Sequence, residues 1–324
     1  MTSGAVSTRP RLGFAGVGWI GRSRLEALAA ADVAEVAAVA DPRGTDLEVD
    51  CLDTFDELLA LDLDGIVVAS PTALHAEQAV AALERGFAVF CQKPLGRDAA
   101  ETSAVVEAAR HADRLLAVDL SYRFTDAARA LRDVIAAGAL GEIYAADLVF
   151  HNAYGPDKPW FYDRRLAGGG CLIDLGIHLV DLALWLLDFP PARVCSASAL
   201  SPSGLDVEEL VYAELEIGSV LVRLACSWRL PAGRDCVIEA SFYGTAGGVR
   251  LSNVDGSFYG LRADRLRGTE TVGLTPLEDD WGGRAAVSWA QRLAHDKGFD
   301  PAAADYVAAA HLLDAIYRES RCAS

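Results

Sequence analysis

The stretch Gly16-Val17-Gly18-Trp19-Ile20-Gly21 decides the fold of the first part of this chain. It follows the apolar run 12–15, which is typical of a short buried strand, and it leads into a helical pattern. A strand, a G-x-G-x-x-G turn and a helix in this order predict a dinucleotide-binding fold. Gly16 permits the tight turn, Gly18 lets a pyrophosphate approach the backbone, and Gly21 lets the helix pack closely on the strand. The phosphates are then expected at the positive end of the helix.

The residues around this turn favour a cofactor site over a glycine-rich turn without a ligand. We expect Trp19 and Ile20 to line the site together with the glycines. A second apolar run, 35–40, ends at Asp41, which lies 20 residues after the last glycine of the turn. An acid there accepts hydrogen bonds from ribose hydroxyls and repels a 2′-phosphate, which favours NAD. Arg43 is either a partner for the 2′-phosphate of NADP or a solvated loop charge.

Composition limits the class of protein. The 324 residues are enough for two domains, and the net charge of −17 argues against nucleic acid or an anionic membrane as a partner. The seven cysteines are scattered without a C-x-x-C pair, so we expect no disulfide framework. We expect the protein to be located in a reducing cytoplasm. The N-terminal residues lack the pattern of a secretory signal, and no apolar run reaches the roughly 18 residues that span a bilayer.

The first part of the chain alternates between strand and helix patterns. Strands are expected at 11–16, 35–41, 64–70, 87–91 and 114–120, with helices at 20–31, 54–61, 73–85 and 98–112. This alternation predicts a doubly wound parallel sheet, in which the ligand lies at the carboxyl ends of the strands.

Polar residues follow the third strand of this predicted sheet. We expect Ser70, Thr72 and His75 at the cofactor edge, with Thr72 as the N-cap of the next helix. A lone histidine here is otherwise more often a surface residue, and a charged histidine is disfavoured at a helix N-terminus.

A lysine follows the fourth strand, in a chain with few lysines. The segment reads Gln92-Lys93-Pro94, and the other lysines are Lys158 and Lys297. A desolvated lysine can have its pKa lowered toward neutrality and can exchange protons with a substrate hydroxyl. The alternative is a lysine that snorkels to solvent at the end of a strand.

After residue 120 the pattern changes to consecutive strands. A helix at 125–137 precedes strands at 142–151, 194–200, 207–217, 219–228, 235–243, 247–252 and 257–262. Short turns between alternating strands predict an open, mostly antiparallel sheet. We therefore expect an α/β protein with a Rossmann domain at 9–120 and a substrate-binding, oligomerising α+β domain at 121–324.

An apolar helix expected at 171–187 carries three ionisable residues. Asp174, His178 and Asp181 are spaced i, i+4 and i+7, so they share one face of a helix. Such groups are costly in an apolar helix unless they are paired or used. They are either a buried Asp–His pair that fixes packing or part of an active site. We expect no metal site, because no further ligand cluster supports one.

These motifs together resemble the Gfo/Idh/MocA family, the glucose–fructose oxidoreductase and inositol dehydrogenase group. The family combines the glycine turn with an E-K-P segment, here Gln92-Lys93-Pro94, and with a G-x-x-x-D-x-x-x-H segment, here 170–178. The resemblance covers nearly the whole chain, including 206–208 and a final helix at 302–318 that the family packs back against the body. The departure is Gln92, which lacks the charge by which glutamate would raise the pKa of the lysine.

The resemblance implies an NAD(P)-dependent oxidoreductase that transfers a hydride between nicotinamide and a secondary hydroxyl or ketone of a sugar, a sugar derivative or a cyclitol. It implies that Lys93 lies beside the nicotinamide, often with a cis peptide before Pro94. It implies that Asp174 binds substrate hydroxyls and that His178 shares proton transfer with Lys93. It places Arg123 near the cofactor, where the alternative is an ion pair at a helix start. It also implies a homodimer or homotetramer built on the open sheet.

The segment before the apolar helix supplies candidates for a substrate wall. They are Tyr154, Trp160, Tyr162 and Arg164, because sugars stack on aromatic rings and hydrogen-bond to arginine; the alternative is a packed loop between domains. Two other functions stay open at this point. One is an NAD-dependent glycoside hydrolase of the same family, and the other is a non-catalytic, NAD(H)-binding regulatory protein.

Overall fold

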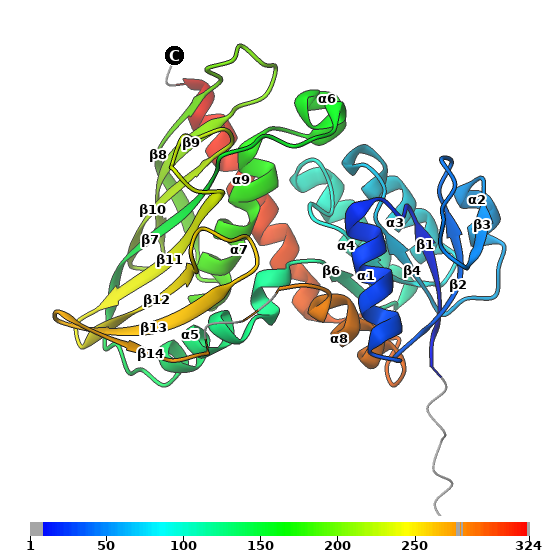
Figure 1. Ribbon diagram of the computed structural model, residues 1–324, viewed down its shortest axis with the longest axis horizontal. Helices are drawn as coiled ribbons and strands as arrows, with labels where there is room; N and C mark the ends of the chain where they lie inside the picture. The colour runs from blue at the N-terminus through cyan, green and yellow to red at the C-terminus, as the bar shows by residue number, and fades with distance from the viewer. Residues whose placement is uncertain (1–8, 277–278, 280, 323–324) are drawn as a thin grey trace, which may run out of the picture. The chain divides into compact units, whose positions relative to one another are not determined.

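The computed structural model describes residues 9–276, 279 and 281–322, and its ribbon is shown in Figure 1. The chain divides into two compact units. The first contains the described residues up to Gly96 together with Ala100–Asp119 and Gly282–Val307. The second contains Arg97–Ala99, Leu120–Trp281 and the described residues from Ala308 onward. The sequence predicts one domain at 121–324 whose final helix, 302–318, packs back on the first domain; in the structure, 282–307 groups with the first unit.

The first unit is built on a parallel six-stranded sheet of order β3-β2-β1-β4-β5-β6. This is the doubly wound order of dinucleotide-binding domains, as predicted. The strands are β1 (Arg11–Ala15), β2 (Glu35–Ala40), β3 (Asp50–Leu52), β4 (Gly65–Val68), β5 (Ala88–Cys91) and β6 (Leu116–Val118). β3 was not predicted, because three residues at an exposed edge carry no periodic signal.

Helices cover the sheet of the first unit. They are α1 (Trp19–Ala30), α2 (Phe55–Leu59), α3 (His75–Glu84), α4 (Ala99–Ala112) and α8 (Arg284–Leu293). α8 was not predicted. Its Trp289 lies against Phe90 of β5, with ring centroids 5.6 Å apart. A Cβ on Gly65 would lie 2.9 Å from the Trp289 ring, so β4 has no room for a side chain beneath this tryptophan.

The second unit is built on an eight-stranded sheet of order β14-β13-β12-β11-β7-β10-β9-β8. The strands are β7 (Ile143–Asn152), β8 (Ala192–Leu200), β9 (Leu210–Ile217), β10 (Val220–Ser227), β11 (Cys236–Gly244), β12 (Gly247–Asn253), β13 (Leu261–Arg267) and β14 (Glu270–Gly273). Only β7 and β10 pair in parallel, so the sheet is mostly antiparallel, as predicted.

One strand of this sheet differs from the prediction. The expected strand at 257–262 starts only at Leu261, because Ser257 closes a turn by accepting from the N–H of Tyr259 at 3.1 Å. The strand then continues to Arg267, and the short β14, which was not predicted, pairs with it.

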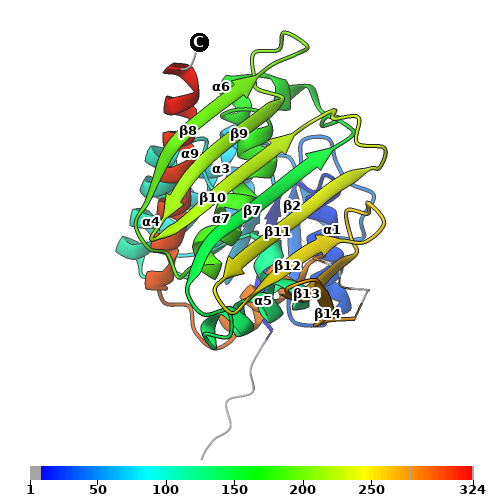
Figure 2. The same ribbon diagram turned by 90° about the vertical axis from the view of Figure 1, so that its left-hand side faces the viewer.

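The helical elements of the second unit lie on one face of its sheet. They include α5 (Asp126–Ala136), α6 (Arg164–Ala167), a π-helical turn (Leu172–Gly176), α7 (Ile177–Leu186) and the later part of α9 (Ala304–Cys322). The π turn packs on β10, α7 on β7, and α5 on β12 and β13. Figure 2 looks onto the opposite face, which the helices of this unit leave uncovered.

The stretch Arg164–Leu186, which includes α6, the π turn and α7, is long and apolar enough, by length and composition, to cross a membrane. This differs from the expectation that no run reaches that length. Inside the protein, 89% of its most apolar window is buried, as in the core helix of a globular domain.

Candidate functional site

The glycine turn joins β1 to α1, as predicted. Gly16 has a φ of 89°, and a Cβ there would lie 2.8 Å from the carbonyl oxygen of Ala69. A Cβ on Gly21 would lie 2.4 Å from the carbonyl oxygen of Gly16. Gly18 precedes the first turn of α1, whose first residue, Trp19, is 63% exposed. The turn therefore has the backbone shape and the helix N-terminus that bind a pyrophosphate.

The carboxyl end of β2 carries Asp41, which is 5% exposed. Asp41 accepts hydrogen bonds from the backbone N–H of Val17 and of Arg43, each at 3.1 Å. The guanidinium of Arg43 also donates to it, at 3.2 and 3.3 Å. Burial raises the pKa of Asp41, but the bonds from Arg43 and Val17 outweigh burial and hold that pKa below its usual value. The acid that favours NAD and the arginine that suits NADP therefore bind each other.

Asp41→Ser is expected to shift binding from NADH toward NADPH by about tenfold or more, which corresponds to about 1.4 kcal/mol. The change removes the charge that repels a 2′-phosphate and releases Arg43 to bind it. The dissociation constants of NADH and NADPH, measured by nicotinamide fluorescence, give the ratio without a substrate. In the matched variant Arg43→Ala, we expect the binding of NADPH to weaken. An unchanged ratio in Asp41→Ser would contradict this role for Asp41.

Two residues after β4 differ from their predicted settings. Thr72 is buried and is the first residue of a 3-10 turn, Thr72–Leu74, so it does not cap α3. The intervening turn delays the start of the helix to His75, which explains the error. Ser70 donates through its Oγ to Oε1 of Gln78 at 2.6 Å.

His75 is buried rather than at the surface. Its Nδ1 lies 2.7 Å from the carbonyl oxygen of Pro94, and its Nε2 lies 2.7 Å from that of Ser70. Burial lowers the pKa of His75. The neutral ring carries one N–H and donates to one of the two carbonyls at a time. His75 thus connects the loop after β4 to the loop after β5.

The loop after β5 contains Gln92 and the half-buried Lys93, and the Lys93–Pro94 peptide is cis, as the resemblance implied. The buried amide of Gln92 donates from Nε2 to Oδ2 of Asp119 at 2.7 Å. Asp119 also accepts from Nε of Arg24 at 2.6 Å, and the side chains of this ion pair are each 1% exposed. Glutamine therefore suits position 92, because an amide can donate to Asp119 and a carboxylate cannot.

In the second unit, Asp174 lies in the π-helical turn Leu172–Gly176, and His178 follows in α7. The sequence predicts a regular helix here; π turns of this kind are frequent at functional sites. Oδ2 of Asp174 accepts from the indole Nε1 of Trp228 at 3.0 Å. The rings of His178 and Tyr122 form a T-shaped pair, with centroids 4.9 Å apart. Asp174 and His178 are both half-buried.

Asp181, the third ionisable residue of this helical segment, has a different partner from Asp174 and His178. Its carboxylate is 1% exposed and accepts from Nε of Arg123 at 2.8 and 3.0 Å. Burial raises the pKa of Asp181, although Arg123 opposes this. Arg123 therefore forms a buried ion pair with the middle of α7 rather than with a helix start, and its cofactor role stays a prediction.

The aromatic candidates for the substrate wall lie in different surroundings. Tyr154 is 57% exposed and donates to Asp235 at 2.7 Å. Trp160 stacks on Phe161 with centroids 3.8 Å apart. The rings of Tyr162 and Trp228 form a T-shaped pair with centroids 5.8 Å apart, so Tyr162 is the aromatic candidate joined most directly to the Asp174 site.

Arg164, the remaining wall candidate, contacts the second unit's own polar groups. Its Nε donates to the carbonyl oxygen of Asp206 at 3.2 Å, and its Nη2 lies 3.5 Å from Oε2 of Glu208. These contacts give it a structural task, and a substrate contact through Arg164 stays a prediction.

Trp228 and Arg229, which contact Asp174 and Tyr162, were not predicted from the sequence. Arg229 has a φ of 56°, a left-handed conformation that is rare outside glycine. Its guanidinium lies 3.1 Å from the Tyr162 hydroxyl and 3.2 Å from Oε1 of Glu209. Nothing local in the sequence marks these residues, because their roles depend on partners far along the chain.

Metal ligands are not grouped in the part of the chain that the structure describes. No set of three or more His, Cys, Asp or Glu residues there has the arrangement to hold a metal ion.

Comparison with known proteins identifies related sequences over most of the chain. The description "Oxidoreductase family, NAD-binding Rossmann fold" matches residues 11–120, and "GFO/IDH/MocA C-terminal domain" matches residues 128–250. D-glucoside 3-dehydrogenase of Escherichia coli (strain K12) is 30% identical over 71% of this chain and 70% of its own length. The rhizopine catabolism protein MocA of Rhizobium meliloti is 30% identical over 74% and 77%. The structure of GenD2 from gentamicin A biosynthesis in complex with NAD has a TM-score of 0.80 and 25% identity, covering 99% of this chain and 97% of that one.

Proposed function

The chain belongs to the Gfo/Idh/MocA family of NAD-binding oxidoreductases, and from this membership we propose that it oxidises a secondary hydroxyl, or reduces the corresponding ketone, of a sugar, a sugar derivative or a cyclitol. The observation that carries the proposal is Lys93, a half-buried lysine at the carboxyl end of β5. In a sheet of this order the ligand lies at the carboxyl ends of the strands. The relative named D-glucoside 3-dehydrogenase supports a sugar as substrate.

We assign the residues of this chain the following tasks. The bound cofactor supplies a nicotinamide that accepts or donates a hydride. The turn 16–21 binds its pyrophosphate, and Asp41 binds the adenosine ribose in NAD. Lys93 or His178 holds the proton that leaves the substrate hydroxyl during oxidation, and Asp174 fixes the hydroxyl by accepting a hydrogen bond.

The carboxylate of Asp174 is suited to anchor a hydroxyl group. The indole of Trp228 donates to one of its oxygens and fixes its orientation. A carboxylate has about four acceptor positions, and the bond from Trp228 occupies one of them. Tyr162, which packs on Trp228, is the wall residue we place nearest to the substrate. Tyr154, Trp160 and Arg164 stay candidates.

The first experiment measures nicotinamide absorbance with NAD, and separately with NADP, against a panel of sugars, cyclitols and sugar acids. Reduction of the cofactor with one class of compound supports the proposal and identifies the substrate class. Cleavage of a glycoside without accumulation of reduced cofactor would identify the NAD-dependent hydrolase instead. Tight NAD binding without turnover across the panel would point to the regulatory alternative.

We also propose that the protein works in a reducing cytoplasm and has no nucleic-acid or membrane partner. Its net charge of −17 would repel polyanions and anionic lipid surfaces. Cys171 and Cys226 are buried thiols with their Sγ atoms 3.9 Å apart, which suits a reducing compartment.

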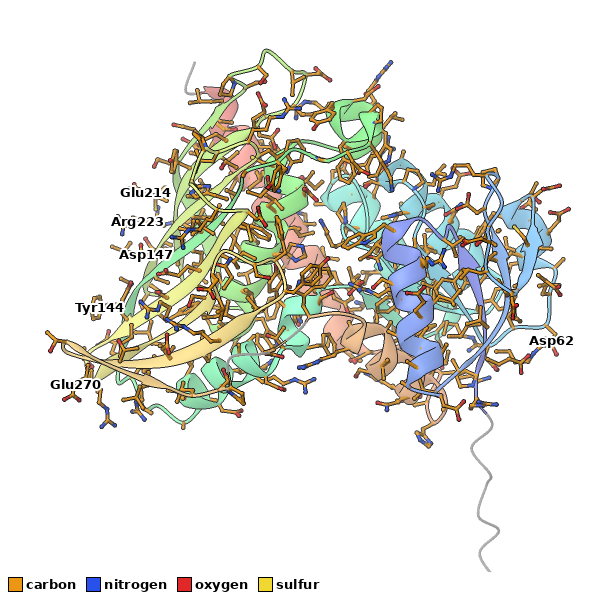
Figure 3. The ribbon with its side chains drawn as sticks, in the orientation of Figure 1. Asp62, Tyr144, Asp147, Glu214, Arg223 and Glu270 are labelled. Atoms are coloured by element: carbon orange, nitrogen blue, oxygen red, sulfur yellow. The ribbon has the colours of Figure 1, made fainter. Side chains whose placement is uncertain are left out.

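The uncovered face of the second sheet supports a homodimer or homotetramer. This face exposes Tyr144, Tyr212 and Leu221 to 54%, 52% and 62%. Arg223 of β10 lies beside Asp147 of β7, with Nε to Oδ1 at 2.6 Å, and Figure 3 shows both on this face with Tyr144. Apolar groups mixed with charges of both signs suit contact with a second copy of the same surface.

Leu221→Glu combined with Tyr144→Glu is expected to convert the assembly into monomers, because it buries two unpaired carboxylates in the contact. Sedimentation velocity of the wild type and the variant gives the oligomeric state, and circular dichroism checks the fold. The control is Leu61→Glu, at an apolar side chain 37% exposed in the first unit, which should leave the assembly intact. Monomeric wild-type protein would overturn the proposal.

A further inference from the structure

The buried carboxylate of Glu208 accepts hydrogen bonds from the start of the helical segment that carries Asp174 and His178. Glu208 is 5% exposed. Its Oε1 accepts from the N–H of Gly170 at 2.8 Å and from the N–H of Leu172 at 3.1 Å. Its backbone oxygen accepts from the N–H of Cys171, between them, at 2.9 Å. Three successive backbone N–H groups of the segment therefore donate to one residue, which lies more than thirty positions later in the chain.

This junction replaces an ordinary helix cap. The residue at the N-cap position of the π turn, Cys171, makes no capping bond with its side chain. The N–H groups at a helix start need acceptors and favour negative charge, and Glu208 supplies both. Because the capping residue is distant in sequence, the position of this helix start depends on tertiary structure.

Two further residues hold the carboxylate of Glu208. The hydroxyl of Tyr317, on α9, donates to Oε1 at 2.8 Å. Nη2 of Arg164 lies 3.5 Å from Oε2. Tyr317 has its pKa raised well above the usual value, chiefly by burial and then by the charge of Glu208, so it stays a neutral donor. Glu208 is thereby fixed from the side of α9 as well as by the helix start.

The two glycines at the junction have no room for a side chain. A Cβ on Gly170 would lie 2.0 Å from the backbone oxygen of Glu208. A Cβ on Gly169 would lie 2.0 Å from the hydroxyl of Tyr317. Both distances are far below van der Waals contact, so the glycines allow Glu208 and Tyr317 to approach the backbone.

We infer that Glu208 is a positioning residue: it sets the place of the π turn and thereby the place of the Asp174 carboxylate and the His178 ring. The link is short, because the N–H of Asp174 donates to the carbonyl oxygen of Gly170, whose own N–H is bound by Glu208. The inference rests on the proposed function only in assigning catalytic tasks to Asp174 and His178; the positional claim stands apart from it.

The bond between Trp228 and Asp174 provides a readout that needs neither substrate nor cofactor. The chain has six tryptophans, so 5-fluorotryptophan labelling gives a simple fluorine NMR spectrum, in which Trp228→Phe assigns the Trp228 signal. In Glu208→Ala we expect this signal to shift or broaden, because Asp174 leaves its position beneath the indole. In Glu208→Gln, whose carbonyl still accepts from the two N–H groups, the signal should stay closer to the wild type.

Kinetics with the identified substrate test the consequence. Glu208→Ala is expected to lower kcat/KM by about ten- to a hundredfold while the Kd of NADH changes less than twofold, with Glu208→Gln in between. Tyr317→Phe should resemble Glu208→Gln. The control is Asp264→Asn, at a buried carboxylate bound by Arg250 and Arg262, which should reduce stability without moving the Trp228 signal.

The two proposals fail in different ways. An unmoved Trp228 signal in Glu208→Ala overturns the positioning role, whatever the kinetics. A moved signal with unchanged kcat/KM supports the positioning of Asp174 and contradicts its catalytic task. If Glu208→Ala does not fold, Glu208→Gln and Tyr317→Phe carry the test, and a wild-type signal and wild-type rates in both overturn the inference.

Discussion

Replacing Gln92 with glutamate is expected to lower the free energy of unfolding by about 2–4 kcal/mol at neutral pH, although the family resemblance favours glutamate at this position. The amide of Gln92 donates to Asp119 at 2.7 Å, inside a pair with Arg24 whose side chains are 1% exposed. A carboxylate there would face the carboxylate of Asp119, which already pairs with Arg24. Two carboxylates sharing one buried site cannot both ionise without a large cost.

The loss of stability in this variant should depend on pH. The pKa of the new carboxyl group is raised in the folded state, so it binds a proton more readily there than in the unfolded chain. Below the ordinary glutamate pKa of about 4.3, the group is protonated in both states and the variant keeps its stability. As the pH rises from there toward the folded-state pKa, the unfolded chain loses its proton first, so the folded state becomes less stable. Urea denaturation at pH values near 5 and 8 should show the larger deficit at the higher pH.

A compensating change separates this explanation from a general effect of charge. Adding Asp119→Asn to Gln92→Glu should recover part of the loss, because the new amide can donate to the new carboxylate. Gln78→Glu is the matched control: its oxygen accepts from Ser70, and a carboxylate can accept the same bond. Equal deficits in Gln92→Glu and Gln78→Glu would contradict the argument.

Lys93→Met is expected to lower kcat by about a hundredfold to ten-thousandfold, the usual contribution of a positioned acid–base group. The NADH dissociation constant should change little, because methionine preserves most of the side-chain volume and the site we propose for the phosphates is the turn at 16–21. Steady-state turnover and NADH fluorescence measure the two quantities. A small primary amine added to Lys93→Ala should restore part of the rate.

The few lysines of the chain provide a clean control for this prediction. Lys297 forms an ion pair with Asp64 in the first unit, so Lys297→Met should affect stability and leave kcat within about twofold. His178→Ala is expected to lower kcat as well, since His178 is the other candidate for holding the substrate proton. Wild-type turnover in both Lys93→Met and His178→Ala would remove these two residues from the mechanism.

The sequence was sufficient for most of the fold, because long apolar runs separated by turns define strands directly. The elements that it missed lack such a signal. β3 is three residues at an exposed edge, β14 is exposed throughout, and α8 is a short helix whose Trp289 packs on a distant strand. Turn geometry accounts for the remaining shifts: a 3-10 turn delays α3 to His75.

The candidate site was predictable where spacing alone identifies it and unpredictable where partners are distant in sequence. The glycine turn, Asp41, Lys93, Asp174 and His178 come from local motifs. Their supporting contacts do not: Gln92 binds Asp119, Asp174 binds Trp228, and three N–H groups bind Glu208. Only the folded chain brings such partners together. The sequence therefore predicts the residues of the candidate site more readily than the residues that hold them in place.

The first unit also has a consequence for synthesis, because its parts lie at opposite ends of the chain. When the ribosome has made the first 120 residues, every strand of the six-stranded sheet exists, but α8 does not. Phe90 and Gly65 then lack Trp289, and the N–H of Leu115 lacks the carbonyl oxygen of Lys297 that binds it at 2.7 Å. This apolar patch of the nascent sheet stays uncovered until the entire second sheet has been translated. The cofactor-binding unit, although first in the sequence, is completed late, and the nascent chain is most exposed to aggregation and most in need of chaperones during that interval.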